Sequence, residues 1–165
     1  MKSIITLLVV LAFTFTKVGS ASVIGINFSN RGEKVVDYEA EIRDVLESEG
    51  LEPFVVDLLV AQSKHESGNY KNSLTKYNNV FARHYHKNDT FATSAGAKAE
   101  GHSRFAKYPS LRNATLSQIS YFKRKQYSFK WKSAYQFALE LKSKRYYEAP
   151  IEVYTNALNK YLRKM

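Results

Sequence analysis

Apolar residues recur at helical spacing in five stretches of the chain. In the first, within residues 33–49, apolar side chains stand three and four residues apart: Val35, Tyr38, Ile42, Val45 and Leu46. Such a stripe is typical of a helix with one face on a hydrophobic core. Gly50 follows it, and glycine readily adopts the left-handed conformation that ends helices. We therefore predict a helix over residues 33–49 that ends at Gly50.

The second stretch predicts a more deeply buried helix that begins at Pro53, a residue suited to a first helical turn. Its residues form two stripes: Phe54, Leu58 and Ala61 in one, and Val55, Leu59, Gln62 and Glu66 in the other. A helix that is apolar on two faces is normally buried. Its last turn is then expected to carry Glu66 out of the core, and Gly68 to end the helix.

Three further helices are predicted in the second half of the chain, each with a residue that favours a helix start. Asn113 is the expected cap of the first and Ser133 of the second, and Pro150 opens the third. Their apolar stripes follow at three- and four-residue spacing: Leu116, Ile119 and Phe122, then Ala134, Phe137, Ala138 and Leu141, then Ile151, Tyr154, Leu158 and Tyr161.

Helical periodicity fades between residues 69 and 108. This stretch is rich in Asn, Thr, Ser, Gly and His, and Gly96 and Gly101 are its expected turn points. We predict loops with one β-hairpin here. The whole pattern therefore predicts a mainly α fold, a helical bundle with an irregular loop and β-hairpin lobe.

The N-terminus has the pattern of a secretory signal peptide. Lys2 precedes an apolar run over residues 4–13, and small residues at positions 19–21 offer a cleavage site. The run is shorter than the roughly 20 residues of a membrane span, although an uncleaved anchor is the alternative. We predict a signal peptide over 1–21, a leader over 22–32 and one catalytic domain over 33–165. The mature protein is expected to be secreted, periplasmic or cell-wall associated, without stable membrane insertion.

The amino-acid composition limits the possible catalytic groups and binding partners. The 165 residues include no cysteine, which excludes thiolate nucleophiles and cysteine-based zinc sites. The formal net charge of +10 predicts attraction to a polyanion, which could be nucleic acid, anionic lipid or an acidic cell wall. Because export separates a protein from nucleic acid, a wall or membrane surface is the favoured partner, and no nucleic-acid partner is expected.

Glu66 is the strongest candidate for chemistry. A carboxyl group at the end of a buried apolar helix is partly removed from water, and this raises its pKa. A glycosidase needs such a carboxyl as its general acid. Taken alone, a glutamate at a helix end is far more often a solvated residue of a terminal turn than a catalytic acid.

The surrounding motifs resemble those of the endo-β-N-acetylglucosaminidases, glycoside hydrolase family 73 in the lysozyme-like superfamily. The resemblance runs from Phe54 to Leu158 and rests on four motifs in order: Ala61, Gln62, Glu66, Ser67 and Gly68; Asn78, Asn79, Val80, Phe81 and Ala82; Phe105, Tyr108 and Ser110; and Tyr147 with Tyr154. It implies a lysozyme-like fold and hydrolysis of the β-1,4 bond after N-acetylglucosamine in peptidoglycan. We expect a monomer that uses no cofactor.

The resemblance also implies roles for individual residues. Glu66 would protonate the glycosidic oxygen. The second group would be a carboxylate of the irregular lobe, with Glu100 preferred over Asp89, or the N-acetyl group of the substrate itself. Tyr154 would orient the sugar or simply pack in the core, and Asn79 would line the groove or close a turn. Phe81 and Tyr108 are the remaining candidates for substrate binding.

The sequence departs from the family pattern in three places. Ala82 stands where the family has glycine, residues 117–120 lack the aspartate that is frequent there, and Lys64 and His65 replace small or apolar residues. Because of these changes, a catalytically inactive, cationic wall-binding protein is an alternative to the enzyme. A lytic transglycosylase is a second alternative, since residues 94–97 weakly resemble a motif of that class.

His84 and His86 lie two apart and could share one face of a strand, as metal ligands do. No third ligand stands out beside them, so we expect no metal site.

Overall fold

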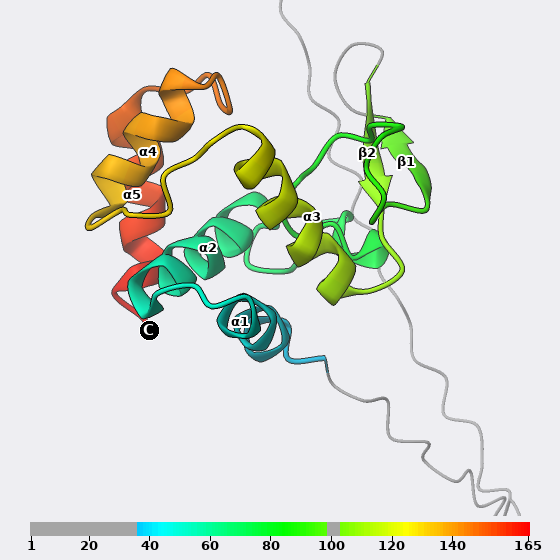
Figure 1. Cartoon of the computed structure of the whole chain (residues 1–165), viewed down its shortest axis with the longest axis horizontal. Helices are drawn as coiled ribbons and strands as arrows, with labels where there is room; N and C mark the ends of the chain where they lie inside the picture. Colours follow the sequence, from blue (N-terminus) through cyan, green and yellow to red (C-terminus); the bar gives the residue numbers. More distant parts are fainter. Residues whose placement is uncertain (1–35, 99–102) are drawn as a thin grey trace, which may run out of the picture. The chain divides into compact units, whose positions relative to one another are not determined.

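The structure, a computed structural model, describes residues 36–98 and 103–165. The predicted signal peptide, the leader and the start of the first helix lie outside the described residues, as do Gly101 and Glu100. Within them the chain is mainly α-helical, as predicted (Figure 1). The elements are α1 (Tyr38–Ser48), α2 (Pro53–Glu66), the short 3₁₀ helix η1 (Thr75–Tyr77), β1 (Ser94–Lys98), β2 (Arg104–Lys107), α3 (Leu111–Arg124), α4 (Ala134–Ser143) and α5 (Ile151–Leu162).

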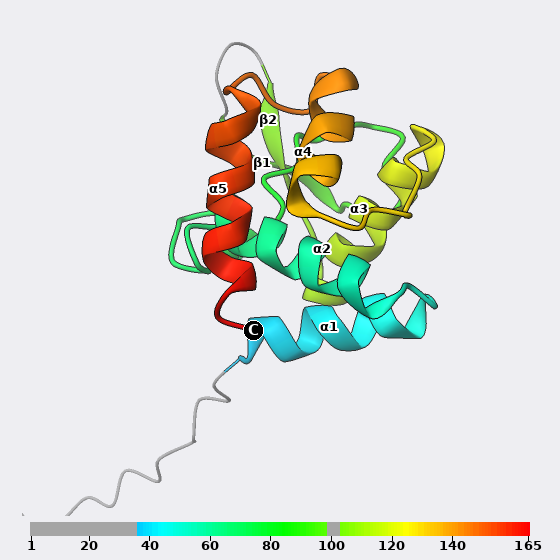
Figure 2. The same ribbon diagram turned by 90° about the vertical axis from the view of Figure 1, so that its left-hand side faces the viewer.

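Helix α2 is the central element of the fold. It packs against α1 and α5, while α4 packs on α5 and α1 on α3 (Figures 1 and 2). Every residue from Val55 to Ser63 except Asp57 is buried, so both predicted stripes face the core. Phe54, at the start of one stripe, stays 37% exposed. Burial on several sides explains why this helix lacks a polar face.

Caps fix where the helices begin, and two of them correct the predictions. The Asp37 carboxylate accepts from the N–H of Ala40, so α1 begins at Tyr38 and residues 36 and 37 are not helical. Ser110, rather than Asn113, caps α3. Its Oγ accepts from the Asn113 N–H at 3.2 Å and donates to Asn113 Oδ1 at 2.7 Å.

The other predicted starts are confirmed. The hydroxyl of Ser133 accepts from the Gln136 N–H at the start of α4, and α5 begins immediately after Pro150. Pro53 occupies the first turn of α2. Gly50 follows α1 with a φ of +75°, the left-handed conformation that glycine adopts without strain.

The predicted hairpin is present as an antiparallel pair of β1 and β2, in which Ser94 pairs with Lys107 and Ala95 with Ala106. Gly96 lies inside β1, so its assignment as a turn point is wrong. A Cβ atom there would come within 3.1 Å of the Phe105 carbonyl oxygen. Close approach of the neighbouring strand therefore explains this glycine.

None of the helices in residues 36–98 and 103–165 is long and apolar enough to cross a membrane.

Candidate active site

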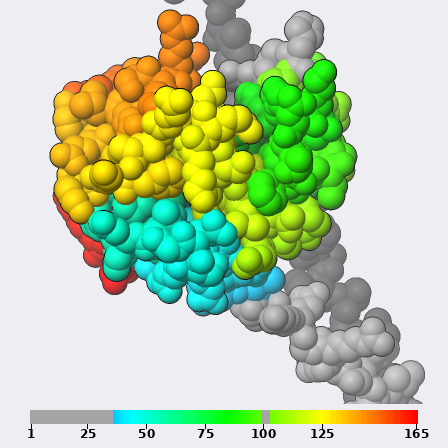
Figure 3. Space-filling view, in the orientation of Figure 1, coloured from blue at the N-terminus to red at the C-terminus, as the bar shows by residue number. Residues whose placement is uncertain are grey.

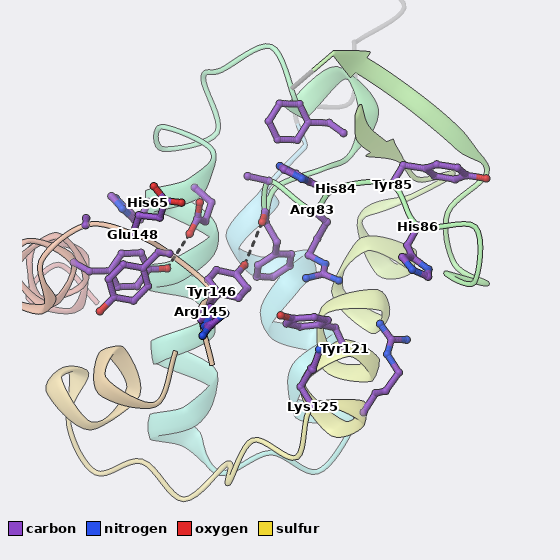
Figure 4. A pocket seen from close by; sticks show the side chains of 18 of the residues that line it. His65, Arg83, His84, Tyr85, His86, Tyr121, Lys125, Arg145, Tyr146 and Glu148 are labelled. Carbon is purple, nitrogen blue, oxygen red and sulfur yellow. Dashed lines mark hydrogen bonds between the residues drawn. The ribbon is translucent and has the colours of Figure 1, made fainter. Parts of the chain in front are cut away.

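A cleft of about 950 Å³ opens beside the C-terminal end of α2 (Figure 4). Its walls come from the segment after η1, from the last turn of α3, and from the segment that leads into α5. In the space-filling view of Figure 3, the end of α3 and the chain after it (yellow) lie between the α4 side of the molecule (orange) and the hairpin lobe (green). The lining residues are His65, Glu66, Phe81, Ala82, Arg83, His84, Tyr85, His86, Asn88, Phe105, Tyr121, Arg124, Lys125, Arg145, Tyr146, Tyr147, Glu148, Ala149 and Tyr154.

Glu66 reaches this cleft because α2 ends at that residue. The chain turns at once through three consecutive residues with positive φ, Gly68, Asn69 and Tyr70. Ser67 stabilises the turn: its hydroxyl donates to the Ser63 carbonyl and accepts from the Tyr70 N–H. The Ser67-Gly68 pair of the motif thus terminates the helix and leaves the Glu66 side chain at the edge of the core.

The Glu66 carboxyl group is largely removed from water, although the residue keeps some exposure in the cleft, and it has one hydrogen-bond donor among the described residues. Tyr154 Oη donates to Glu66 Oε1 at 2.8 Å. Burial raises the pKa of Glu66 to about 7, and the bond from Tyr154 opposes that rise. The direction follows from physics: burial penalises the charged carboxylate more than a single donor stabilises it. The group is therefore partly protonated near neutral pH.

Tyr154 is held from three sides. Its ring stacks on Tyr147 with centroids 4.1 Å apart, and the His65 ring meets it edge-on at 5.1 Å. Its Oη accepts from Gln62 Nε2 at 3.3 Å. Burial raises the pKa of Tyr154 well above its ordinary value, so this hydroxyl keeps its proton at neutral pH. Burial also lowers the pKa of His65, which favours the neutral ring next to Glu66.

Behind Tyr154 the hydrogen bonds continue into the core. Gln118 Nε2, from α3, donates to Gln62 Oε1 at 3.1 Å and to Tyr146 Oη at 3.3 Å. Tyr146 Oη in turn donates to the Phe81 carbonyl oxygen at 3.4 Å (Figure 4). A polar chain thus connects α2, α3, α5 and two loops beneath the cleft.

Four cationic side chains line the cleft. Figure 4 shows Arg83 extending toward Tyr121, over whose ring its guanidinium lies at 3.7 Å. Arg124 approaches the same ring at 5.9 Å, and Lys125 and Arg145 also line the cleft. None of these four side chains takes part in an ion pair with another described residue. Their charge is therefore available to a ligand.

Two of the predicted substrate-binding residues are turned away from the cleft. Asn79 is fully buried; its Nδ2 donates to the carbonyl oxygens of Arg83 and Ala106, and its Oδ1 accepts from the Arg83 N–H. It closes a turn, the second of its two expected roles. Tyr108 is 4% exposed and does not line the cleft, so its predicted contact with substrate is not supported.

The hydroxyl of Tyr108 instead belongs to a network with Asp89. Tyr108 Oη donates to Asp89 Oδ2 at 3.1 Å, and Ser117 Oγ donates to the same oxygen at 2.6 Å. The Phe91 N–H donates to Asp89 Oδ1 at 3.1 Å. Asp89 is thereby committed to the lobe and does not line the cleft with Glu66. Glu100, the preferred second acid, lies outside the described residues.

Phe81 and Tyr154 do line the cleft, although each is almost fully buried. Ala82 has a φ of +49°, in the left-handed region that favours glycine. The His84 ring packs edge-on against Phe105 at 5.3 Å. Within the described residues no three His, Asp or Glu side chains are grouped to hold a metal ion.

Sequence reasoning missed Arg83, Tyr146, Glu148 and Gln118. The first three are in loops without periodicity and gave no signal. Gln118 did give one, because it stands on the buried stripe of α3 between Thr115 and Phe122, where a polar residue needs an internal partner.

Two comparisons with known proteins find a match to this chain. The profile of the glucosaminidase family, described as mannosyl-glycoprotein endo-beta-N-acetylglucosaminidase, matches residues 40–165. A solved structure described as a type VI secretion system effector–immunity complex from Pseudomonas protegens superposes with a TM-score of 0.60 at 18% identity. The match covers 77% of this chain and 86% of that one. A search of curated proteins finds no match.

The structural likeness shows a shared fold, and the predicted lysozyme-like class is confirmed. The family profile spans most of the chain, including every element from α2 to α5 and the Glu66 cleft. The chain belongs to the glucosaminidase family of glycoside hydrolases.

Proposed function

We propose that this protein hydrolyses the β-1,4 bond after N-acetylglucosamine in peptidoglycan, with Glu66 as the general acid. The observation that carries the proposal is the position of Glu66, at the end of a buried helix and on the wall of a large cleft, with a pKa raised to about 7. A carboxyl in this state still holds a proton near neutral pH and can pass it to the departing glycosidic oxygen.

The second catalytic group remains a choice between two candidates. Hydrolysis of a glycosidic bond needs either a second carboxylate or help from the substrate's N-acetyl group. Asp89 is a poor candidate because both of its oxygens already accept hydrogen bonds away from the cleft. We retain Glu100 and the N-acetyl group, and Glu100→Gln distinguishes them: a strong loss of rate supports Glu100, and near-normal rate supports the substrate.

The cationic residues that line the cleft support an anionic polymer as substrate. Arg83, Arg124, Lys125 and Arg145 face it without a carboxylate partner among the described residues, and peptidoglycan carries carboxylates on its peptides. Tyr85, Tyr121 and Tyr147 supply aromatic surface on which sugar rings can pack. A wall substrate also agrees with the proposed signal peptide over 1–21, the leader over 22–32 and a monomeric domain over 33–165. N-terminal sequencing of exported protein tests the cleavage near Ala21.

The decisive experiment is digestion of purified peptidoglycan followed by mass analysis of the fragments. We expect new reducing ends at N-acetylglucosamine, and a loss of roughly 10²–10⁴-fold in rate for Glu66→Gln, the usual contribution of a general acid. Glu47→Gln, an exposed change on α1, is the matched control and should keep full rate.

Each alternative function gives a different result in the same assay. Anhydro-sugar ends would identify a lytic transglycosylase. Binding of the wall without any turnover would identify an inactive, cationic wall-binding protein. A folded Glu66→Gln variant that digests at the wild-type rate would remove Glu66 from the mechanism.

A further inference from the structure

The polar chain behind the cleft begins at Gln118. This residue is fully buried on α3 and does not line the cleft, so the proposed function gives it no role. It is nevertheless connected to Glu66 through two intervening side chains, Gln62 and Tyr154.

The hydrogen bonds of this chain run outward from Gln118. A primary amide has donors only on nitrogen and an acceptor only on oxygen, and a tyrosine hydroxyl has one hydrogen to give. Gln118 Nε2 donates to Gln62 Oε1, so Gln62 turns its own Nε2 toward Tyr154 and donates to Oη. The single hydrogen of Tyr154 is then left for Glu66 Oε1.

In the second branch, the hydrogen bonds also run outward from Gln118. Tyr146 Oη accepts from Gln118 Nε2 and therefore gives its hydrogen to the Phe81 carbonyl oxygen. Both donors of Gln118 are used, while its own Oε1 is buried without a hydrogen-bond partner. An unsatisfied buried acceptor destabilises a fold. Gln118 thus uses both of its N–H donors, while its carbonyl oxygen stays without a hydrogen bond.

We propose that Gln118 is a positioning residue: by donating outward along both branches, it directs the Tyr154 hydrogen onto Glu66 Oε1 and reserves Oε2 for the proton that Glu66 transfers. The proposal rests on the proposed role of Glu66 and concerns how that acid is oriented. Among the described residues, Oε2 has no hydrogen-bond partner, and the residue lines the cleft, where a glycosidic oxygen would stand.

Without Gln118, the hydrogen bonds between Gln62, Tyr154 and Glu66 can reverse their direction. Gln62 can then rotate its amide and present Oε1 to Tyr154, whose hydrogen turns away from Glu66. Tyr154 Oη becomes free to accept the proton of neutral Glu66. That arrangement stabilises the protonated acid and points its proton into the protein, so proton transfer slows and the pKa of Glu66 rises further.

Other titratable and charged groups also face Glu66. His65 comes from the same helix, Tyr154 from α5, Tyr146 and Glu148 from the segment before α5, and Arg83 from the opposite wall. A change at position 118 keeps the His65, Glu148 and Arg83 side chains, but it also removes the bond from Gln118 to Tyr146. Within the described part of the chain, the side chain of Gln62 is bonded only to Tyr154 and Gln118, so a substitution at Gln62 separates the Tyr154 branch from the Tyr146 branch.

The test is Gln118→Met, which keeps the volume and removes both donors. We expect kcat on peptidoglycan to fall about tenfold, below the roughly 10²–10⁴-fold loss of the acid itself, with KM unchanged. The alkaline limb of the pH profile, which reports Glu66, should move to higher pH. Thr115→Val, equally buried on the same helix and bonded only to the Leu111 carbonyl, is the control and should leave the profile in place.

A second variant protects the test against a folding defect. Gln62→Met breaks the next link and should shift the same limb in the same direction. The kcat of the variant with both changes should be no lower than that of the more impaired single variant, because both changes interrupt the same series of hydrogen bonds. Wild-type kcat and an unmoved alkaline limb in folded Gln118→Met or Gln62→Met would overturn the proposal. If Glu66→Gln is itself active, the proposed function fails first; if it is inactive and these variants are normal, only the inference about Gln118 fails.

Discussion

Two carboxyl groups in this protein each lie beside a tyrosine, and they differ in the number of hydrogen bonds that they accept. Glu66 accepts one hydrogen bond, from Tyr154, whereas Asp89 accepts three, from Tyr108, Ser117 and the Phe91 N–H. Three donors compensate an anion for the water it loses, but one does not. Asp89 is thus tied into the lobe by three donors, whereas Glu66 has one donor and a pKa raised by burial. The comparison teaches that two partly buried carboxyl groups beside a tyrosine can differ mainly in how many donors the fold supplies to them.

The largest expected effect of this difference on stability is at Glu66. The pKa of Glu66 is about 7 in the folded state against an ordinary value of 4.5. Between these values the folded chain holds a proton that the unfolded chain has released, so stability falls as pH rises through this window. Glu66→Gln removes the penalty and should stabilise the fold above pH 7 by roughly 1–3 kcal/mol.

Urea denaturation of both proteins at two pH values measures this effect. Below pH 4.5 the difference between them should vanish, because both states are then protonated. An equal difference at both pH values would mean that charge on Glu66 does not penalise the folded state.

Asp89→Asn should act in the opposite direction. The amide offers one acceptor oxygen in place of two and brings an NH₂ group into a site of donors, so the fold should lose about 1–3 kcal/mol at neutral pH. Chemical denaturation gives this value. The rate of peptidoglycan digestion per folded molecule should stay close to that of the wild type, and a large loss of rate would show that Asp89 serves the reaction after all.

The two tyrosines provide a matched pair of phenylalanine substitutions. Tyr154→Phe removes the one bond that lowers the pKa of Glu66, so the pKa should rise and the alkaline limb of the pH profile should move upward. We expect roughly a tenfold loss of kcat, about the worth of one charge-assisted hydrogen bond. Tyr108→Phe should leave the limb where it is, and a shift of equal size there would contradict the separation of the two sites.

The smallest effect concerns Ala82, in the turn that Asn79 closes. Its φ of +49° is a left-handed conformation that costs an L-residue about 1–2 kcal/mol, while glycine loses roughly 0.4–1 kcal/mol more chain entropy on folding. Ala82→Gly should therefore stabilise the protein by roughly 0.5–1 kcal/mol, seen as a higher Tm. An unchanged or lower Tm would show that the alanine methyl group makes a compensating contact.

The sequence predicted the helices well because each has an apolar stripe with a recognisable first residue. Ser110 and Asn113 show the limit of that logic: both are capping residues three positions apart, and only their mutual hydrogen bonds identify the cap. Gly96 shows another limit, since a close approach between strands leaves the same trace in a sequence as a turn.

Local reasoning found Glu66 and Tyr154 because both stand at helical positions and in recognisable motifs. It could not find the connection from Gln62 to Gln118, which are 56 residues apart, or the cationic residues that three separate segments bring to the cleft. Such contacts depend on how α2, α3 and α5 pack, and no spacing within one helix encodes that. Glu100 lies outside the described residues, and its role stays a prediction.

The bond between Glu66 and Tyr154 joins positions 88 residues apart in the chain. Closing so long a loop costs chain entropy, and the packing of α5 on α2 compensates that cost in the folded protein. The surroundings of Glu66 are therefore complete only while α5 is docked. A cut in the exposed segment just before α5, at residues 148–150, would free that helix to leave, and the titration of Glu66 would then revert toward that of a glutamate in water.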